Sequence, residues 1–136
     1  MHRARVAFVF FLLACSAVAM ARSVWEGVFT KEQAARGLAT YGEECQKCHG
    51  ENLGGGESGP PMVGDEFLSK WNGKTVADLF AVTRKTMPMD DPGSLGSREY
   101  ADLVAYILSG NGFPAGQKEL DRDAAALAEI RIERKP

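Results

Sequence analysis

Histidine, cysteine and surplus positive charge are all scarce in this sequence. Its 136 residues include 2 histidines and 3 cysteines, which limits any metal site to a few positions. The 16 Lys and Arg are outnumbered by 18 Asp and Glu, so nothing in the charge balance indicates binding to nucleic acid. The hydrophobic content of 45% is ordinary for a chain of this size, and we expect one globular domain.

No apolar run in the sequence has the roughly 18 to 20 residues that a membrane-spanning helix needs. The longest run, residues 6–18, follows Arg3 and Arg5 and leads into the small-residue pattern AMA at residues 19–21. A basic start, an apolar middle and a small-residue end are typical of a secretory signal peptide. We therefore predict a signal peptide over residues 1–21, export to the periplasm, and no transmembrane helix in the processed chain.

A second type of processing is compatible with the same segment. The stretch LLAC ending at Cys15 resembles the lipobox of bacterial lipoproteins, in which Cys15 would carry a lipid anchor. The bulky Leu13 fits that pattern imperfectly, so we favour soluble export and keep the lipid anchor at Cys15 as the alternative. Both interpretations send the chain across a membrane.

Loss of residues 1–21 would leave one histidine and two cysteines, all within the stretch CQKCHG: Cys45, Cys48 and His49. It would also leave 14 Lys and Arg against 18 Asp and Glu, a formal net charge of -4. The two thiols could form a structural disulfide or a redox dithiol, but a redox dithiol is expected at a strand-to-helix turn, and the preceding residues have a helical pattern. A structural zinc site needs four protein ligands, and the processed chain has no fourth Cys or His.

Covalent attachment of haem accounts for all three residues. The two thiols would add to the vinyl groups of the porphyrin, and the imidazole would bind the iron from one side. At positions i, i+3 and i+4, Cys45, Cys48 and His49 lie on one face of a helical turn, so one short segment can hold the ring edge and reach its centre. The sequence therefore predicts one covalently bound haem c.

The hydrophobic pattern predicts an all-α fold. Thr30 followed three residues later by Gln33 indicates a capping box, and Ser97 is the expected N-cap of the last helix. No period-two alternation of useful length is present, so we expect no sheet. The expected helices span residues 31–48, 64–71 and about 75–86, and the last one follows its cap Ser97 and is stopped by Gly110 and Gly112.

The tail that follows the last helix has a helical signal of its own. Asp121 or Asp123 is the candidate cap of a short helix through Ala128, and Leu127 and Ile130 are expected to pack back on the body. We assign this tail no chemistry. The predicted division of the chain is a signal peptide at 1–21, an N-terminal lead at 22–30, one haem-binding domain at 31–110, and the tail at 111–136.

Residues 31–110 resemble a class I c-type cytochrome, a small all-helical electron carrier with one haem. The processed chain, with VWEGVFTKEQAARG before the haem motif and MPMDDPGSLGSREYADLVAYILSGNGFPAG after it, is similar to small bacterial periplasmic cytochromes and to cytochrome modules found with quinoprotein dehydrogenases. The resemblance implies that the N- and C-terminal helices cross, with shorter helices and loops around the haem. It also implies that Tyr106 packs across Gly37.

The second axial ligand must be a residue other than histidine, because His49 is the only histidine in the processed chain. The soft candidates are Met62, Met87 and Met89. In the family that the sequence resembles, the axial methionine lies in a loop before the last helix. The resemblance thus implies Met87, within TMPMDDPG, with Met89 as the main alternative.

Further residues are expected to support the haem. The segment GPPMVG resembles the Gly-Pro-x-Leu-x-Gly segment of class I cytochromes, which implies that the Pro60 carbonyl accepts a hydrogen bond from the His49 ring. Trp71, and either Tyr100 or Tyr106, could donate a hydrogen bond to a haem propionate. Each of these aromatic residues could equally be a core residue with its polar tip at the surface.

A six-coordinate iron with histidine and methionine ligands has no vacant position for a substrate, so the predicted function is one-electron transfer and not catalysis. The expected partners are redox proteins: a dehydrogenase, an oxidase or another cytochrome. One alternative is a cytochrome subunit of a quinoprotein dehydrogenase. A haem protein with an open iron that binds a gas or peroxide, and a haem-free disulfide- or metal-containing interaction module, are the others.

Overall fold

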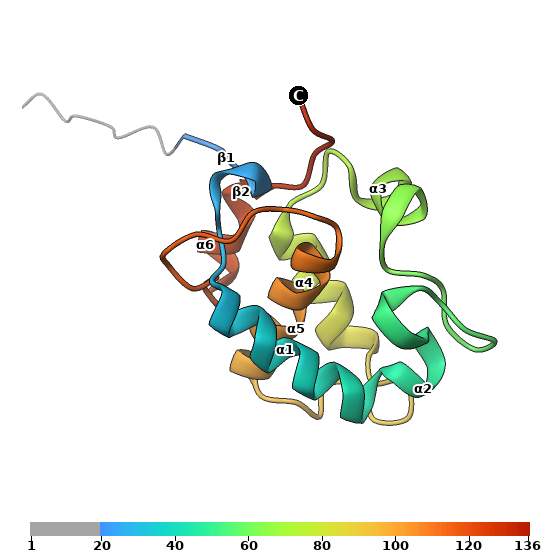
Figure 1. Ribbon diagram of the computed structural model, residues 1–136. Helices are drawn as coiled ribbons and strands as arrows, with labels where there is room; N and C mark the ends of the chain where they lie inside the picture. The colour runs from blue at the N-terminus through green and yellow to red at the C-terminus, as the bar shows by residue number, and fades with distance from the viewer. Residues whose placement is uncertain (1–19) are drawn as a thin grey trace, which may run out of the picture.

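Helices make up nearly all of the regular structure in residues 20–136, the part of the chain that the computed structural model describes (Figure 1). This confirms the predicted all-α cytochrome c fold. Cys15, the alternative lipid attachment site, and all but the last two residues of the predicted signal peptide lie outside the described residues. The helices are α1 (Lys31–Glu44), α2 (Gln46–His49), α3 (Gly64–Trp71), α4 (Val76–Thr86), α5 (Ser97–Gly110) and α6 (Ala124–Ala128), with 3-10 turns at Val24–Glu26 and Glu51–Leu53.

The first predicted helix is divided at the haem-type motif. Thr30 is its N-cap, as the sequence indicates, and the Thr30 hydroxyl accepts a hydrogen bond from the Gln33 N–H at 3.1 Å. The prediction of one helix over residues 31–48 is wrong in one respect, because α1 ends at Glu44 and Cys45 leaves the helical region with φ -122° and ψ -35°. The spacing of apolar residues in the sequence continues through Cys45 and Cys48 without interruption, which is why the sequence pattern does not reveal this kink.

The N-cap of the last large helix lies one residue earlier than predicted. Gly96, not Ser97, is the N-cap of α5, and the Glu99 carboxylate accepts a hydrogen bond from the Gly96 N–H at 2.7 Å. The carboxylate in the first turn thus satisfies the backbone N–H of the cap residue itself, while glycine has no side chain that could accept a hydrogen bond from the first turn. Ser97 is then the first residue of the helix itself.

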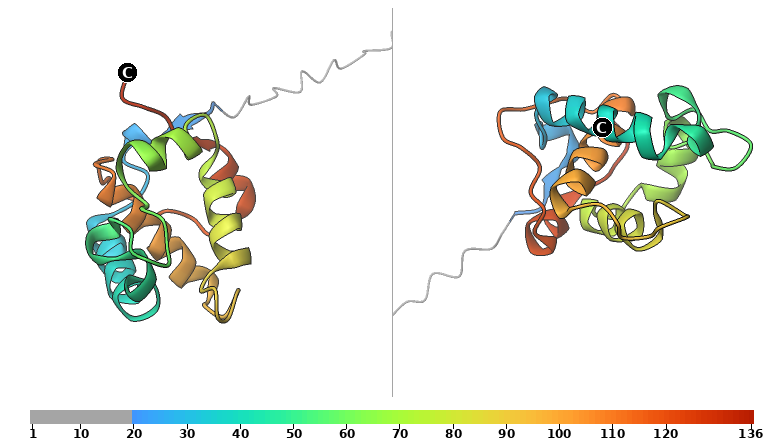
Figure 2. Two further views of the ribbon diagram at one scale, coloured as in Figure 1. Left: turned by 90° about the vertical axis from the view of Figure 1, so that its right-hand side faces the viewer. Right: turned by 90° about the horizontal axis from the view of Figure 1, so that it is seen from below.

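α1 and α5 cross at a point where the two backbones come close together. A side-chain carbon at Gly37 would overlap the carbonyl oxygen of Asp102 and would lie 2.8 Å from the Tyr106 Cβ. Only glycine therefore allows this crossing, and the approach involves the α5 backbone as well as Tyr106. In both views of Figure 2, α5 lies between α1 and α4, so it is the central helix of the molecule.

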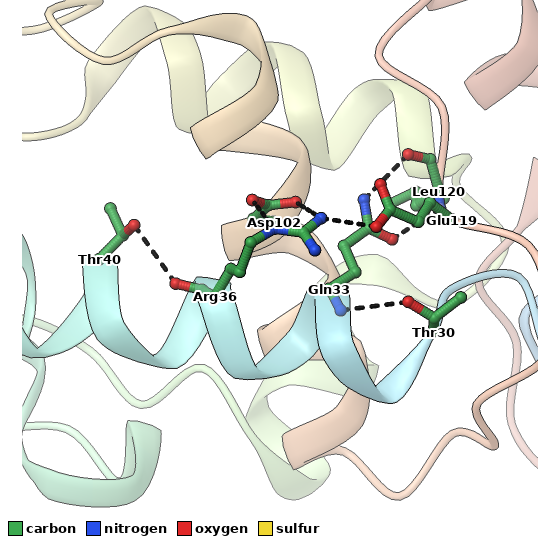
Figure 3. A network of polar contacts seen from close by, with 7 residues as sticks. All are labelled: Thr30, Gln33, Arg36, Thr40, Asp102, Glu119 and Leu120. Atoms are coloured by element: carbon green, nitrogen blue, oxygen red, sulfur yellow. Dashed lines mark hydrogen bonds and ion pairs between the residues drawn. The ribbon is translucent and has the colours of Figure 1, made fainter.

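A polar network fastens the C-terminal tail to this crossing (Figure 3). Arg36 of α1 donates two hydrogen bonds to the buried Asp102 carboxylate of α5, at 2.9 and 3.0 Å, and a third to Glu119 at 2.8 Å. The Gln33 amide, which is buried, donates to the Leu120 carbonyl at 3.0 Å and accepts from the Leu120 N–H at 2.6 Å. The Gln33 side-chain amide thus satisfies both backbone groups of Leu120.

The two ends of the described chain pack against each other, and we call residues 22–30 and 113–134 the terminal clasp. Its strands β1 (Arg22–Ser23) and β2 (Ile130–Arg131) pair in parallel, so the expectation of no sheet is corrected by a two-stranded pair. Strands of two residues are too short to show an alternating pattern in the sequence. The Trp25 indole N–H also donates to the Glu133 carbonyl at 3.0 Å.

Buried side chains of the terminal clasp extend the core of the domain. Leu127 and Ile130, which the sequence predicts to pack back on the body, are both buried, together with Leu120 and Ile132. α6 begins after Asp123, whose carboxylate accepts a hydrogen bond from the Ala126 N–H at 3.2 Å. Within residues 20–136, none of the helices combines the length and the apolar character needed to cross a membrane.

Candidate functional site

A cavity of about 390 Å³ is lined by residues that all lie outside the terminal clasp. Its walls come from the end of α1, α2, the loop after Ser58, the end of α4 with the loop that follows, and one face of α5. The volume is within the usual range for small-molecule and cofactor sites, about 300 to 1,000 Å³. The sulfur-containing and imidazole side chains on its walls are those of Cys45, Cys48, His49, Met62, Met87 and Met89.

The cysteines and the histidine are held by one helical turn. The N–H groups of Cys48 and His49 donate to the Cys45 carbonyl at 3.1 and 3.0 Å, so the three residues stand at positions i, i+3 and i+4 of that turn. Both thiols are free, and the His49 side chain has 8% of its surface exposed. The structure therefore brings together, on one cavity wall, the three residues that the sequence selects for haem attachment.

The environment of Cys45 argues against a redox dithiol. Burial raises the pKa of the Cys45 thiol to about 11, and the nearby Glu44 carboxylate and Cys48 add to this shift. Reactive cysteines in dithiol motifs have the opposite property, a lowered pKa that produces thiolate near neutral pH. A neutral thiol on an apolar cavity wall is compatible with contact between Cys45 and the apolar edge of a porphyrin ring.

The imidazole of His49 is oriented by the loop on its far side. Its Nδ1 lies 2.9 Å from the Pro60 carbonyl oxygen, the hydrogen bond implied by the resemblance of the GPPMVG segment. A side-chain carbon at Gly59 would lie 2.8 Å from the same Nδ1, so the loop fits around the ring only with glycine there. Because Nδ1 is used in donating to this carbonyl, Nε2 is the nitrogen free to bind a metal.

Tyr100 of α5 and Asn111, the residue that follows α5, have polar side chains that fix two segments of the cavity wall. Tyr100 donates from its hydroxyl to the Met87 carbonyl at 2.7 Å. Eleven residues later, Asn111 donates to the Met62 carbonyl at 2.9 Å and accepts from the Gly64 N–H at 3.0 Å. These two anchor points are about 16 Å apart along the helix axis. The segment around Met62 and the segment around Met87 are therefore fixed at opposite ends of α5.

The three candidate methionines differ in their settings. Met62 is two residues after Pro60, which places it on the loop that supports His49 rather than opposite it. Met87 is the C-cap of α4 and is partly buried, whereas 69% of the Met89 side chain is exposed. Both Met87 and Met89 still line the cavity. Met87 is thus the methionine that best combines burial with a position away from the His49 loop.

The supporting residues expected from the sequence are only partly brought together. Pro60 and Tyr100 line the cavity, but Trp71 and Tyr106 do not. Trp71 is buried against Phe67, and the ammonium groups of Lys70 and Lys74 lie over its ring. The assignment of Trp71 to a haem propionate stays a prediction without geometric support.

Sequence reasoning missed two residues that shape the site. The Tyr41 hydroxyl donates to the Gly50 carbonyl at 2.6 Å and so fixes the chain directly after His49. Asn111 follows the end of α5 directly, and its side-chain amide joins that helix to the loop after Pro60. Neither residue belongs to a motif, and their partners are backbone groups, which leave no signal in a sequence.

The residues present fit a covalently held haem c: two thiols on one helical turn, an oriented imidazole, and thioether sulfurs across an apolar cavity. No curated protein and no solved structure matches the chain in the comparisons. Residues 32–107, more than half of the chain, match the family model described as cytochrome c oxidase, cbb3-type, subunit III. The chain therefore belongs to this family and is a c-type cytochrome, a protein whose family carries covalently bound haem c and transfers electrons.

Proposed function

We propose that the protein is a one-electron carrier with one haem c, attached through Cys45 and Cys48 and ligated by His49 and Met87. The observation that carries this proposal is the single apolar cavity on whose walls all four side chains meet. When bound, haem supplies a one-electron exchange between ferric and ferrous iron. The role of a carrier rather than a catalyst follows from two protein ligands, which leave no position for a substrate.

The residues of the chain have separate tasks in this function. Cys45 and Cys48 hold the ring edge, and the Pro60 carbonyl keeps the proton of His49 on Nδ1 so that Nε2 can act as the ligand. A thioether from Met87 favours the reduced state relative to a second nitrogen ligand. Leu95, Leu103 and Ile107 make the wall apolar, which excludes water and favours the reduced state further.

The site of electron exchange is proposed to be the cavity mouth near the two cysteines. Lys47, which lies between the two cysteines in the chain, lines the cavity and forms an exposed ion pair at 3.4 Å with Asp90, another lining residue. Electron carriers exchange partners quickly, so the contact should be small and transient. The partners are proposed to be a dehydrogenase, an oxidase or another cytochrome, in the periplasm after removal of the signal peptide.

The test is the absorption spectrum of the purified mature protein, oxidised and reduced, together with its intact mass. Attachment of one haem predicts a mass increase of one haem group and a c-type spectrum, both lost in the Cys45→Ala, Cys48→Ala double variant. Ligation by Met87 predicts the long-wavelength ferric absorption band that marks methionine bound to iron. This band should disappear in Met87→Ala and remain in Met89→Ala.

Different results would point to the alternatives. Colourless protein from a host that matures c-type cytochromes would overturn the haem proposal. A c-type spectrum without the methionine band would indicate an open iron that binds a gas or peroxide. Loss of the band in Met89→Ala, with the band retained in Met87→Ala, would show that the axial ligand is Met89.

A further inference from the structure

Two buried tyrosines hold the chain next to the two proposed axial ligands. Tyr41 of α1 donates to the Gly50 carbonyl, one residue after His49. Tyr100 of α5 donates to the carbonyl of Met87 itself, at 2.7 Å, and its side chain has 0% of its surface exposed. The methionine side therefore has a direct hydrogen bond from the central helix to the residue proposed as ligand.

The peptide groups of Met87 are held from three directions. Its N–H donates to the Thr83 carbonyl at 2.9 Å, which makes it the last residue tied to α4. Its carbonyl accepts from the Tyr100 hydroxyl and, at 3.3 Å, from the Gly93 N–H. Met89, two residues further on, is exposed and has no hydrogen bond from a side chain within the described residues. The Tyr100 bond thus distinguishes the two rival methionines.

We infer that Tyr100 is a positioning residue that keeps Met87 in place as the axial ligand; this inference rests on the proposed function. The phenol ring lines the cavity while its hydroxyl fixes the backbone of the methionine. A ligand on a loop binds metal more tightly when the loop is already ordered, because less conformational entropy is lost on binding. Removing the hydroxyl loosens this loop and leaves the Met87 carbonyl with the longer bond from Gly93.

The same helix provides a matched control. Tyr106 is on α5, does not line the cavity, and has no hydroxyl hydrogen bond within the described residues; its ring packs on Tyr41 with centroids 5.2 Å apart. Tyr100→Phe and Tyr106→Phe each remove one hydroxyl from one helix and keep the ring. A general effect of losing a phenol would appear in both variants, whereas a positioning effect appears in Tyr100→Phe alone.

The experiment titrates the ferric holoproteins with imidazole, which displaces methionine from iron and abolishes the methionine band. The half-saturating imidazole concentration should fall about fivefold in Tyr100→Phe, the effect of losing one hydrogen bond, and stay unchanged in Tyr106→Phe. Haem content, read from intact mass, should equal that of the wild type in both. The rate of cyanide binding, which also requires methionine to leave, should rise by a similar factor.

The outcomes separate this inference from the proposed function. A wild-type methionine band with the same imidazole midpoint in Tyr100→Phe would overturn the positioning role and leave His49 and Met87 ligation intact. A wild-type protein with haem but without the band would overturn Met87 ligation, and the role of Tyr100 with it. Equal shifts in both phenylalanine variants would also contradict the inference, because they would show a general loss of stability.

Discussion

The two sides of this molecule complete their packing in different ways. At the terminal clasp, the chain fills its own interior, and Val24, Leu127 and Ile132 have none of their surface exposed. At the cavity side, α2 and the loops around Pro60 and Met87 enclose a space that their own side chains do not fill. Figure 1 shows α2 at one end of the molecule and α6, β1 and β2 at the other. We expect the packing of the terminal clasp to supply stability to the fold that the unfilled cavity side does not.

α5 belongs to both sides and separates them. Tyr100, Leu103 and Ile107 face the cavity, while Asp102 is bonded to Arg36 at the crossing with α1. The residues of the crossing with α1 and those of the proposed haem site are therefore on different faces of one helix. Substitutions in the clasp should change the free energy of unfolding without changing the spectrum of the haem.

The largest expected effect of this kind is that of Leu127→Ala. Leu127 of α6 is fully buried in the core, so its truncation leaves a cavity and should lower the free energy of unfolding by about 2 to 5 kcal/mol. Urea unfolding measures the change, and Leu38→Ala, at a leucine with 50% of its surface exposed, is the control with little effect. Loss of the methionine band in folded Leu127→Ala would contradict the expectation that substitutions in the terminal clasp leave the haem spectrum unchanged.

A smaller effect is expected for Gln33→Ala. The substitution removes both hydrogen bonds between the Gln33 amide and the Leu120 backbone, leaving a buried donor and acceptor unpaired, at a cost of about 1 to 3 kcal/mol. The exposed Gln117, in the same tail, provides the control variant Gln117→Ala. If urea unfolding of the two variants were equal, the amide pairing would not be what fastens the tail.

The smallest effect concerns the capping box of α4, at the end of that helix away from Met87. Hydrogen bonds from the Thr75 backbone N–H and hydroxyl lower the pKa of the Asp78 carboxyl. The stability from this group is present above the unfolded-state pKa and is lost as the pH falls through the lower folded-state pKa. Asp78→Asn should therefore lower the free energy of unfolding by less than about 1 kcal/mol at neutral pH.

Unfolding measured in acid provides the check on this last prediction. The difference between Asp78→Asn and the wild type should shrink as the wild-type carboxyl becomes protonated. A difference that stayed constant down to the acid range would mean that the charge of Asp78 does not stabilise the cap. Met87 ligation should be unaffected throughout, because the cap lies at the opposite end of α4.

The helices were predictable because their caps and apolar spacing are local. The boundaries of α3 agree with expectation, Asp123 is the one of the two candidate caps that begins α6, and α4 covers all but the first residue of the predicted range 75–86. The break at Cys45 and the cap at Gly96 were missed, since a kink that preserves side-chain periodicity and a glycine cap leave little local signal. Cys45, Cys48, His49 and Met87 meet in one cavity, but their roles as haem ligands stay predictions for the spectra to test.

The sequence by itself determined the chemistry that is available: two thiols and an imidazole on one helical turn, and a small set of thioethers. It did so because the spacing within a helical turn is a local property. Only the tertiary structure decided that Tyr100 and Asn111 hold opposite ends of the cavity and that the chain termini close the other side. Those contacts join backbone groups to residues far away in the chain, and they exist only once the helices have packed.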